Sequence, residues 1–178
     1  MKKLLIFTVA IMLVMAVFAG CSGGAGTSGD PADIKGEIFE GGEVSALVPE
    51  GWIGFHGADY WEDYEEGYDP TVIQIVKDGE TEFDMFTHPY LQISYFPADY
   101  ELYDLKDVYE NVEDVEPVTI GDYTWEGFSG TSLDTPITLL STVSGDNQFQ
   151  VIMWTKMSEG EISLDDADVQ AILASIAH

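Results

Sequence analysis

Alternating apolar and polar residues recur through most of the chain after residue 40, and this alternation predicts β-strands. Val44, Ala46 and Val48 alternate with their neighbours before the turn Pro49-Glu50-Gly51. Further strands are expected where β-branched and aromatic residues cluster between turn residues, at 71–76, 90–96, 118–120, 123–128, 137–143 and 148–155. Short turns separate several of these strands, at Gly121-Asp122 and at 144–147, so hairpin pairing is expected.

Two segments instead carry the period of an amphipathic helix. Apolar residues recur at i, i+3, i+4 and i+7 in 105–112 and again in 169–176. Asp104 is expected to cap the first helix, and Ser163 the second, with Asp166 at the spacing of a capping box. We therefore predict an α+β fold, an antiparallel β-sheet flanked by helices, with the C-terminal helix packed on the sheet.

The order of these elements resembles the PsbP-like fold. The motif Pro49-Glu50-Gly51-Trp52 and the closing segment 171–176 (AILASI) carry the resemblance, which extends over residues 36–178. That superfamily includes extrinsic proteins of the photosynthetic oxygen-evolving complex, a Ran-binding nuclear import factor and many secreted or lipid-anchored bacterial proteins. The resemblance implies an α+β domain that acts as a binding or assembly module. Basic residues that some members use for docking have no counterpart in this sequence.

The N-terminal segment has the features of a secretory signal. Two lysines precede an uncharged stretch, residues 4–18, which is short for a membrane-spanning helix. Phe18-Ala19-Gly20-Cys21 resembles the lipobox of bacterial lipoproteins, in which the cysteine thiol receives a diacylglyceryl group and becomes the new N-terminus. The alternative is an ordinary secreted protein with an incidental Cys21.

The resulting domain organisation has three parts. A signal peptide (1–20) precedes a Gly/Ser-rich tether (21–33) and a single acidic domain (34–178). We expect the protein to be anchored in the lipid bilayer of the cell membrane through lipidated Cys21, on the extracytoplasmic side, and to be a monomer.

The charge of the chain excludes several functions. The sequence has 33 acidic residues, six lysines and no arginine, and cleavage before Cys21 leaves four lysines and a formal charge of −29. Such a chain cannot follow a phosphate backbone, so nucleic-acid binding is excluded. A single cysteine permits neither an internal disulfide nor a cysteine-based zinc site.

One segment, 59–69, combines six carboxylates with four aromatic residues in eleven positions. Aromatic rings beside carboxylates suit an organic cation or a basic protein, since ion pairing and cation–π contact then act together. The hypothetical ligand-binding residues are Trp61, Glu62, Asp63, Tyr64, Glu65, Glu66 and Tyr68. In the alternative interpretation this segment is a short amphipathic helix. Its inward-pointing rings are then Trp61, Tyr64 and Tyr68, at i, i+3 and i+7.

No pattern in the sequence predicts a cofactor, a metal or a catalytic centre. His56 and His88 are 32 residues apart without metal-binding spacing, and no G-x-S-x-G motif occurs. We therefore predict a non-catalytic binding or accessory module. Two alternatives stay open. A small extracytoplasmic hydrolase would need a cleft that brings His56 or His88 to a nucleophile or carboxylate. An inert cell-surface spacer would have no concave pocket.

Overall fold

The structure is a computed structural model that describes residues 29–178. The predicted signal peptide, Cys21 and most of the predicted tether lie outside the described residues. Within 29–178, no helix is both long enough and apolar enough to cross a membrane.

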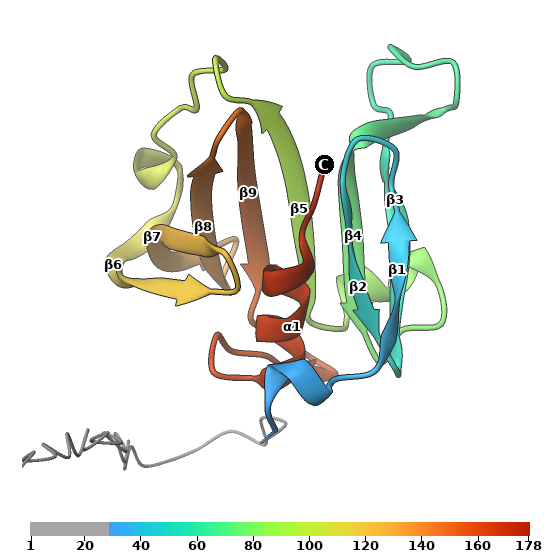
Figure 1. The fold of residues 1–178 in the computed structure, drawn as a ribbon. Coiled ribbons are helices and arrows are strands. Elements are labelled where there is room, and N and C mark those ends of the chain that lie inside the picture. Colours follow the sequence, from blue (N-terminus) through green and yellow to red (C-terminus); the bar gives the residue numbers. More distant parts are fainter. Residues whose placement is uncertain (1–28) are drawn as a thin grey trace, which may run out of the picture.

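A seven-stranded antiparallel sheet with the order β3-β4-β5-β9-β8-β7-β6 forms the main layer (Figure 1). Its strands are β3 (Trp52–Ala58), β4 (Tyr68–Lys77), β5 (Tyr90–Pro97), β6 (Glu110–Ile120), β7 (Tyr123–Ser132), β8 (Thr135–Ser144) and β9 (Asn147–Trp154). Two small hairpins accompany it, formed by β1 (Gly36–Glu40) with β2 (Ser45–Pro49) and by β10 (Lys156–Met157) with β11 (Gly160–Glu161). The helical elements are three 3₁₀ turns, η1 (Pro31–Asp33), η2 (Glu82–Phe86) and η3 (Lys106–Val108), and one α-helix, α1 (Ala167–Ser175).

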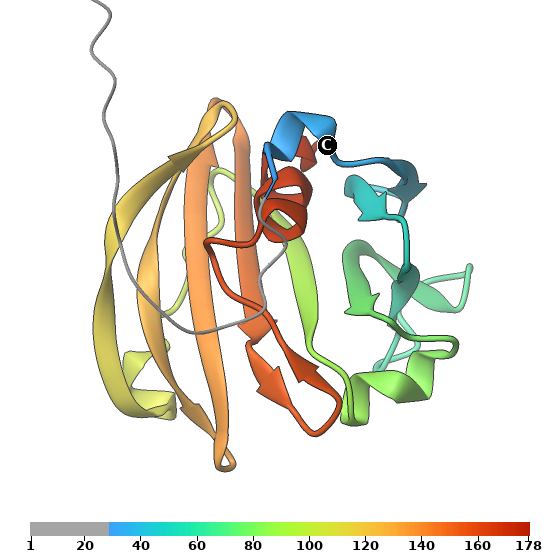
Figure 2. The ribbon, with the colours of Figure 1, turned by 90° about the horizontal axis from the view of Figure 1, so that it is seen from below.

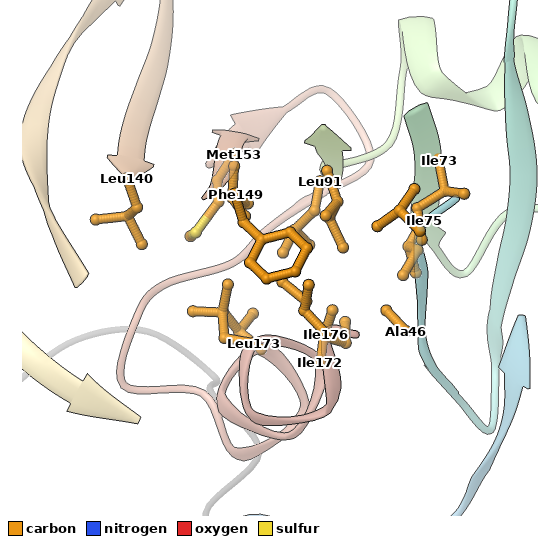
Figure 3. Packing of buried hydrophobic residues seen from close by; sticks show 14 of the residues in the cluster. Ala46, Ile73, Ile75, Leu91, Leu140, Phe149, Met153, Ile172, Leu173 and Ile176 are labelled. Atoms are coloured by element: carbon orange, nitrogen blue, oxygen red, sulfur yellow. The ribbon is translucent and has the colours of Figure 1, made fainter. Parts of the chain in front are cut away.

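The sheet is strongly curved, and its concave face surrounds α1 (Figure 2). Alternation along β4, β5 and β9 directs one set of apolar side chains toward the helix, including Ile75, Leu91 and Phe149. Ile172 and Leu173 of α1 meet them, and all five residues are fully buried (Figure 3). The C-terminal helix thus packs on the sheet as predicted.

The predicted α+β class is wrong, because the protein is mostly β. Strands account for 53% of the structure and helical residues for 13%. α1 is the one α-helix among residues 29–178, so the sheet is not flanked by helices. The outer, convex face is instead covered by the irregular segment 98–109, from which Leu105 and Tyr109 pack against Phe128, Ile137 and Leu139.

The predicted helix over 104–112 is the element that misled this assignment. Only η3 is helical there, Val108 is 69% exposed, and β6 begins at Glu110. β6 breaks register with β7 twice, between Glu110 and Glu113 and between Val115 and Val118. Of the four apolar positions behind the prediction, Leu105, Val108 and Tyr109 precede β6 and only Val112 lies in it, so the helical spacing runs across an irregular segment and the start of a strand. Leu105 and Tyr109 pack on the convex face without forming an α-helix.

The start of α1 also differs from the expectation. Asp166, and not Ser163, is the N-cap residue, and the helix begins at Ala167. The carboxylate of Asp166 accepts hydrogen bonds from the backbone N–H and the hydroxyl of Ser163, both at 3.1 Å. These two hydrogen bonds close a separate turn before the helix. Ser163 donates to the Asp166 carboxylate in both of them and is not the residue that caps α1.

The 3₁₀ turn η1 occupies the end of the predicted tether and packs against α1.

The burial of α1 generates a stability prediction. Leu173→Ala should lower the free energy of unfolding of the full chain by about 2–5 kcal/mol, because it leaves a cavity between helix and sheet. Urea unfolding followed by tryptophan fluorescence measures this change. Leu133→Ala, at a position 98% exposed in the β7–β8 turn, is the matched control and should change stability by at most about 0.5 kcal/mol. Equal effects of the two substitutions would contradict the packing described here.

Candidate functional site

The segment of residues 59–67 connects β3 to β4 and projects beyond the ends of the strands (Figure 1); we call it the acidic loop. Its shape is set by Asp59, whose carboxylate accepts hydrogen bonds from the backbone N–H groups of Asp63 and Tyr64, each at 3.0 Å. The loop thus folds around one of its own carboxylates.

The backbone donors change the acidity of Asp59. Desolvation acts to raise its pKa, but the backbone N–H groups of the loop, led by that of Tyr64, outweigh it and hold the pKa below the ordinary 3.8. Asp59 is therefore ionised at neutral pH and continues to accept both hydrogen bonds.

Two of the three aromatic rings of the acidic loop are largely in solvent. Trp61 is 84% exposed, Tyr60 82% and Tyr64 37%. No helix forms between 59 and 67, so the amphipathic-helix alternative is wrong. Glu62 and Gly67 adopt left-handed backbone conformations, with φ of 57° and 76°, which do not continue an α-helix.

The carboxylates of the acidic loop lack cationic partners within the described part of the chain. Glu62, Asp63, Glu65 and Glu66 are all exposed. The two ion pairs found within 29–178 join Lys106 to Asp114 and Lys156 to Glu161, on other elements. The loop therefore presents negative charge and aromatic surface together.

The base of the loop is an aromatic stack that connects three strands. Tyr68 at the start of β4 stacks on His56 of β3, with ring centroids 3.9 Å apart, and His56 contacts Phe39 of β1 at 4.9 Å. Tyr68 is half-buried as a result, in contrast to Trp61. The sequence pattern gave no signal for this stack, because its three rings are brought together only by the fold.

Tyr64 lies closer to the body of the protein than Trp61 does. Desolvation, followed by the charges of Asp69 and Glu43, raises the pKa of Tyr64 above its ordinary value. Its hydroxyl thus stays protonated at neutral pH. The negative charge around the base of the loop comes from three segments: the loop itself, the β1–β2 turn with Glu43, and β4 with Asp69.

Three cavities lie elsewhere on the described surface, and none is lined by residues of the acidic loop. One, of about 500 Å³, lies between β1 and the first half of β3. A second of about 460 Å³ is bounded by the segment 102–106 and the convex face, and a third of about 260 Å³ lies beside η1.

The two histidines, which the hydrolase alternative requires near a nucleophile or carboxylate, have different neighbours. His88 contacts the hydroxyl of its exposed neighbour Thr87 through Nδ1 at 3.0 Å, and His56 is held in the aromatic stack. Neither residue lines one of the three cavities. Among residues 29–178, no group of three or more histidine, cysteine or acidic side chains is arranged to hold a metal ion.

Comparison with known proteins does not show a family for this chain. No family model matches it, and no curated protein does. A crystal structure of a protein from Bacteroides thetaiotaomicron VPI-5482 is similar over 80% of this chain, with 15% sequence identity and a TM-score of 0.44. The chain covers 48% of the length of that protein.

The role of Asp59 can be tested directly. Asp59→Ala should speed amide hydrogen exchange at residues 63 and 64 at least about fivefold at neutral pH, because both N–H groups lose their acceptor. Asp63→Ala is the control, since the donor at that position is the backbone N–H and it remains.

The same carboxylate gives a pH dependence. A depressed pKa means that the contribution of Asp59 is present above the ordinary value of 3.8 and is lost as pH falls through the lower folded value. The protection of residues 63 and 64 should therefore persist through weakly acidic solution. Loss of that protection between pH 6 and 5 would contradict the assigned hydrogen bonds.

Proposed function

We propose that this chain is a lipid-anchored, extracytoplasmic binding module that uses the acidic loop to hold a cationic group, presented by a basic protein or an organic cation, without catalysing a reaction. The observation that carries the proposal is the exposure of Trp61 and Tyr60, each more than four-fifths in solvent, among carboxylates that no lysine of residues 29–178 neutralises.

The exposed rings favour a binding role on energetic grounds. Burial of a large apolar side chain contributes about 1.5–3 kcal/mol, and here that contribution is not realised within the domain itself. Large exposed aromatic residues that lie together mark interaction surfaces more often than isolated ones do. A partner that covers these rings would recover part of that free energy.

The surrounding carboxylates specify the chemistry of the partner. A cation over the face of an indole or phenol ring is attracted by the ring quadrupole, by about 0.5–1 kcal/mol at exposed sites. The four unpaired carboxylates of the loop add direct attraction, and the net charge of the domain accelerates encounter with any cation. Anionic and nucleic-acid partners are repelled by the same charges.

The lipobox supports the position of this module at a membrane. Nine residues separate Cys21 from η1, and their Gly/Ser-rich composition would give a reach of roughly 15–18 Å by coil scaling. The screening length at physiological salt is only about 8 Å. The domain would therefore stand clear of anionic headgroups, with its loop free to meet a partner.

The proposal predicts a loss of binding when the rings are removed. Tyr60→Ala with Trp61→Ala should weaken binding of a fluorescent heptalysine peptide, or of choline, at least about fivefold without changing the melting temperature. Tyr103→Ala with Phe86→Ala is the matched control, because it removes two exposed rings from other segments. Fluorescence anisotropy for the peptide and calorimetry for choline measure the affinities. Equal losses in both double variants would contradict a role for the loop.

A second pair of variants separates local from overall charge. The loop variant removes three exposed charges from the acidic loop, by Glu62→Gln, Glu65→Gln and Glu66→Gln together. The β6 variant removes three exposed charges from β6, by Glu110→Gln, Glu113→Gln and Glu116→Gln together. The loop variant should bind heptalysine several-fold more weakly than the β6 variant. Identical affinities would mean that only the net charge matters.

The anchor is predicted separately from the binding site. Cys21→Ala should abolish incorporation of labelled fatty acid and leave the protein unprocessed or released, because the acceptor thiol is lost. Metabolic labelling and membrane fractionation measure this outcome. A variant that is labelled and retained like the wild type would show that Cys21 is not the lipidation site.

A further inference from the structure

The two edges of the seven-stranded sheet differ in how far they resist pairing with another strand. At one end, β6 contains Pro117, two register irregularities and four acidic residues, Glu110, Glu113, Asp114 and Glu116. Proline, irregular register and charge are the features by which natural proteins prevent an edge strand from pairing with a strand of another molecule.

At the other end, β3 has almost none of these features. Its sequence WIGFHGA contains no lysine, acidic residue or proline, and its pairing with β4 is regular from Trp52 to His56, with a single irregularity between His56 and Gly57. Within residues 29–178, β3 pairs with β4 on one side, and no strand pairs with its other side. This edge therefore presents backbone N–H and C=O groups in an order that a further strand can use.

A groove accompanies the open edge. The cavity of about 500 Å³ lies between β1 and the first half of β3, and Phe39, Val48 and Trp52 contribute apolar surface to it. Glu37, Glu50 and Lys35 are its charged residues, and Asp33 follows in the smaller adjoining cavity. Alternate side chains of an added strand would thus meet apolar surface with acidic groups beside it.

The edge leads directly into the acidic loop. β3 ends at Ala58, and the loop begins with the next residue, Asp59. Seven residues of extended chain span about 23 Å, so the groove, the free edge and the loop follow one another along a single path. A peptide in extended conformation can contact all three.

We infer that the partner of the acidic loop is an extended, lysine- or arginine-containing protein segment that adds to β3 as an eighth strand. This inference rests on the proposed function and specifies its partner. Backbone hydrogen bonds to β3 would supply affinity that does not depend on sequence, and the acidic groups of the groove and loop would select basic side chains.

The charge of the protein favours this occupant over a second copy of the chain. Pairing of β3 with β3 of another molecule brings together two domains that each carry 33 acidic residues against four lysines. Their repulsion opposes self-association, whereas the same charge attracts a basic segment.

Backbone methylation of a probe peptide tests strand addition. The probe is a nonapeptide of alternating lysine and threonine. It is compared with two backbone N-methylated forms, one methylated at the odd-numbered positions and the other at the even-numbered positions. The full chain in a non-ionic detergent is titrated with each peptide, and hydrogen exchange of residues 53–57 and 59–68 is followed. All three peptides have the same charge, so only the backbone donors differ.

The inference predicts that the unmodified peptide binds and slows exchange at 53–57 as well as in the loop. At least one methylated form should bind at least about tenfold more weakly. Equal binding of all three peptides, with protection confined to 59–68, would overturn strand addition and leave the proposed function intact. Absence of binding by any of them would overturn the inference, and absence of binding to heptalysine and choline as well would overturn the proposed function. Protection of 53–57 that rises with protein concentration in the absence of peptide would identify a second copy as the occupant, and would also overturn the inference.

A pair of substitutions at the junction tests the path of the peptide. Ala58 is exposed at the end of β3, so Ala58→Lys and Ala58→Glu are both accommodated at the surface. Ala58→Lys should weaken binding of the unmodified peptide at least about threefold, and Ala58→Glu should not. Leu133→Lys adds the same charge at an exposed turn remote from β3 in the strand order, and is the matched control. Equal effects of Ala58→Lys and Leu133→Lys would overturn this placement of the peptide.

Discussion

The contact between the concave face of the sheet and α1 is the constraint on which the rest of the structure depends. A helix of nine residues is too short to be stable alone in water, and a sheet with one apolar face exposed is not stable either. Each element supplies the surface that the other needs. The curvature of the sheet follows from this pairing, since strands far apart in the sheet order contribute to one core, from Ile73 on β4 to Trp125 on β7.

The C-terminal end of the chain is fixed by the same contact. Ala177 exchanges two backbone hydrogen bonds with Ser45 of β2, and the hydroxyl of Tyr123 donates to the carbonyl of Ile176 at 2.9 Å. The β1–β2 hairpin is thereby held over the β3 end of the sheet, where Phe39 and Val48 approach Gly54 so closely that a Cβ atom would meet them. The helix thus determines where the groove beside β3 lies, although it does not line that groove.

The sequence predicted local structure well where a single period governs a segment. The β8–β9 hairpin and the buried stripe of α1 follow from alternation and from the helical repeat, because each packs against one surface throughout. The prediction for 104–112 failed because its apolar residues belong to two different elements, the irregular segment that covers the convex face and the start of β6, and a period read from sequence cannot distinguish that from a helix. The capping of α1 failed for a related reason, since Ser163 and Asp166 are at the right spacing but form a turn of their own.

The candidate site divides in the same way between local and non-local features. The composition of the acidic loop is visible in the sequence, and its conformation depends on Asp59, four and five residues from the donors that it holds. The stack of Phe39, His56 and Tyr68 joins residues from three strands and has no sequence signature.

The contrast between the sheet edges likewise appears only once β3 is known to be an outer strand. The absence of charge in β3 would be unremarkable in a central strand, where both edges are paired. At an outer position it leaves backbone groups available in a protein whose opposite edge is strongly protected. Negative charge then has two effects on one molecule: it opposes association of the open edge with another copy, and it favours a basic strand at that edge. A highly acidic domain can therefore keep an unprotected strand without the self-association that such a strand causes in a neutral protein.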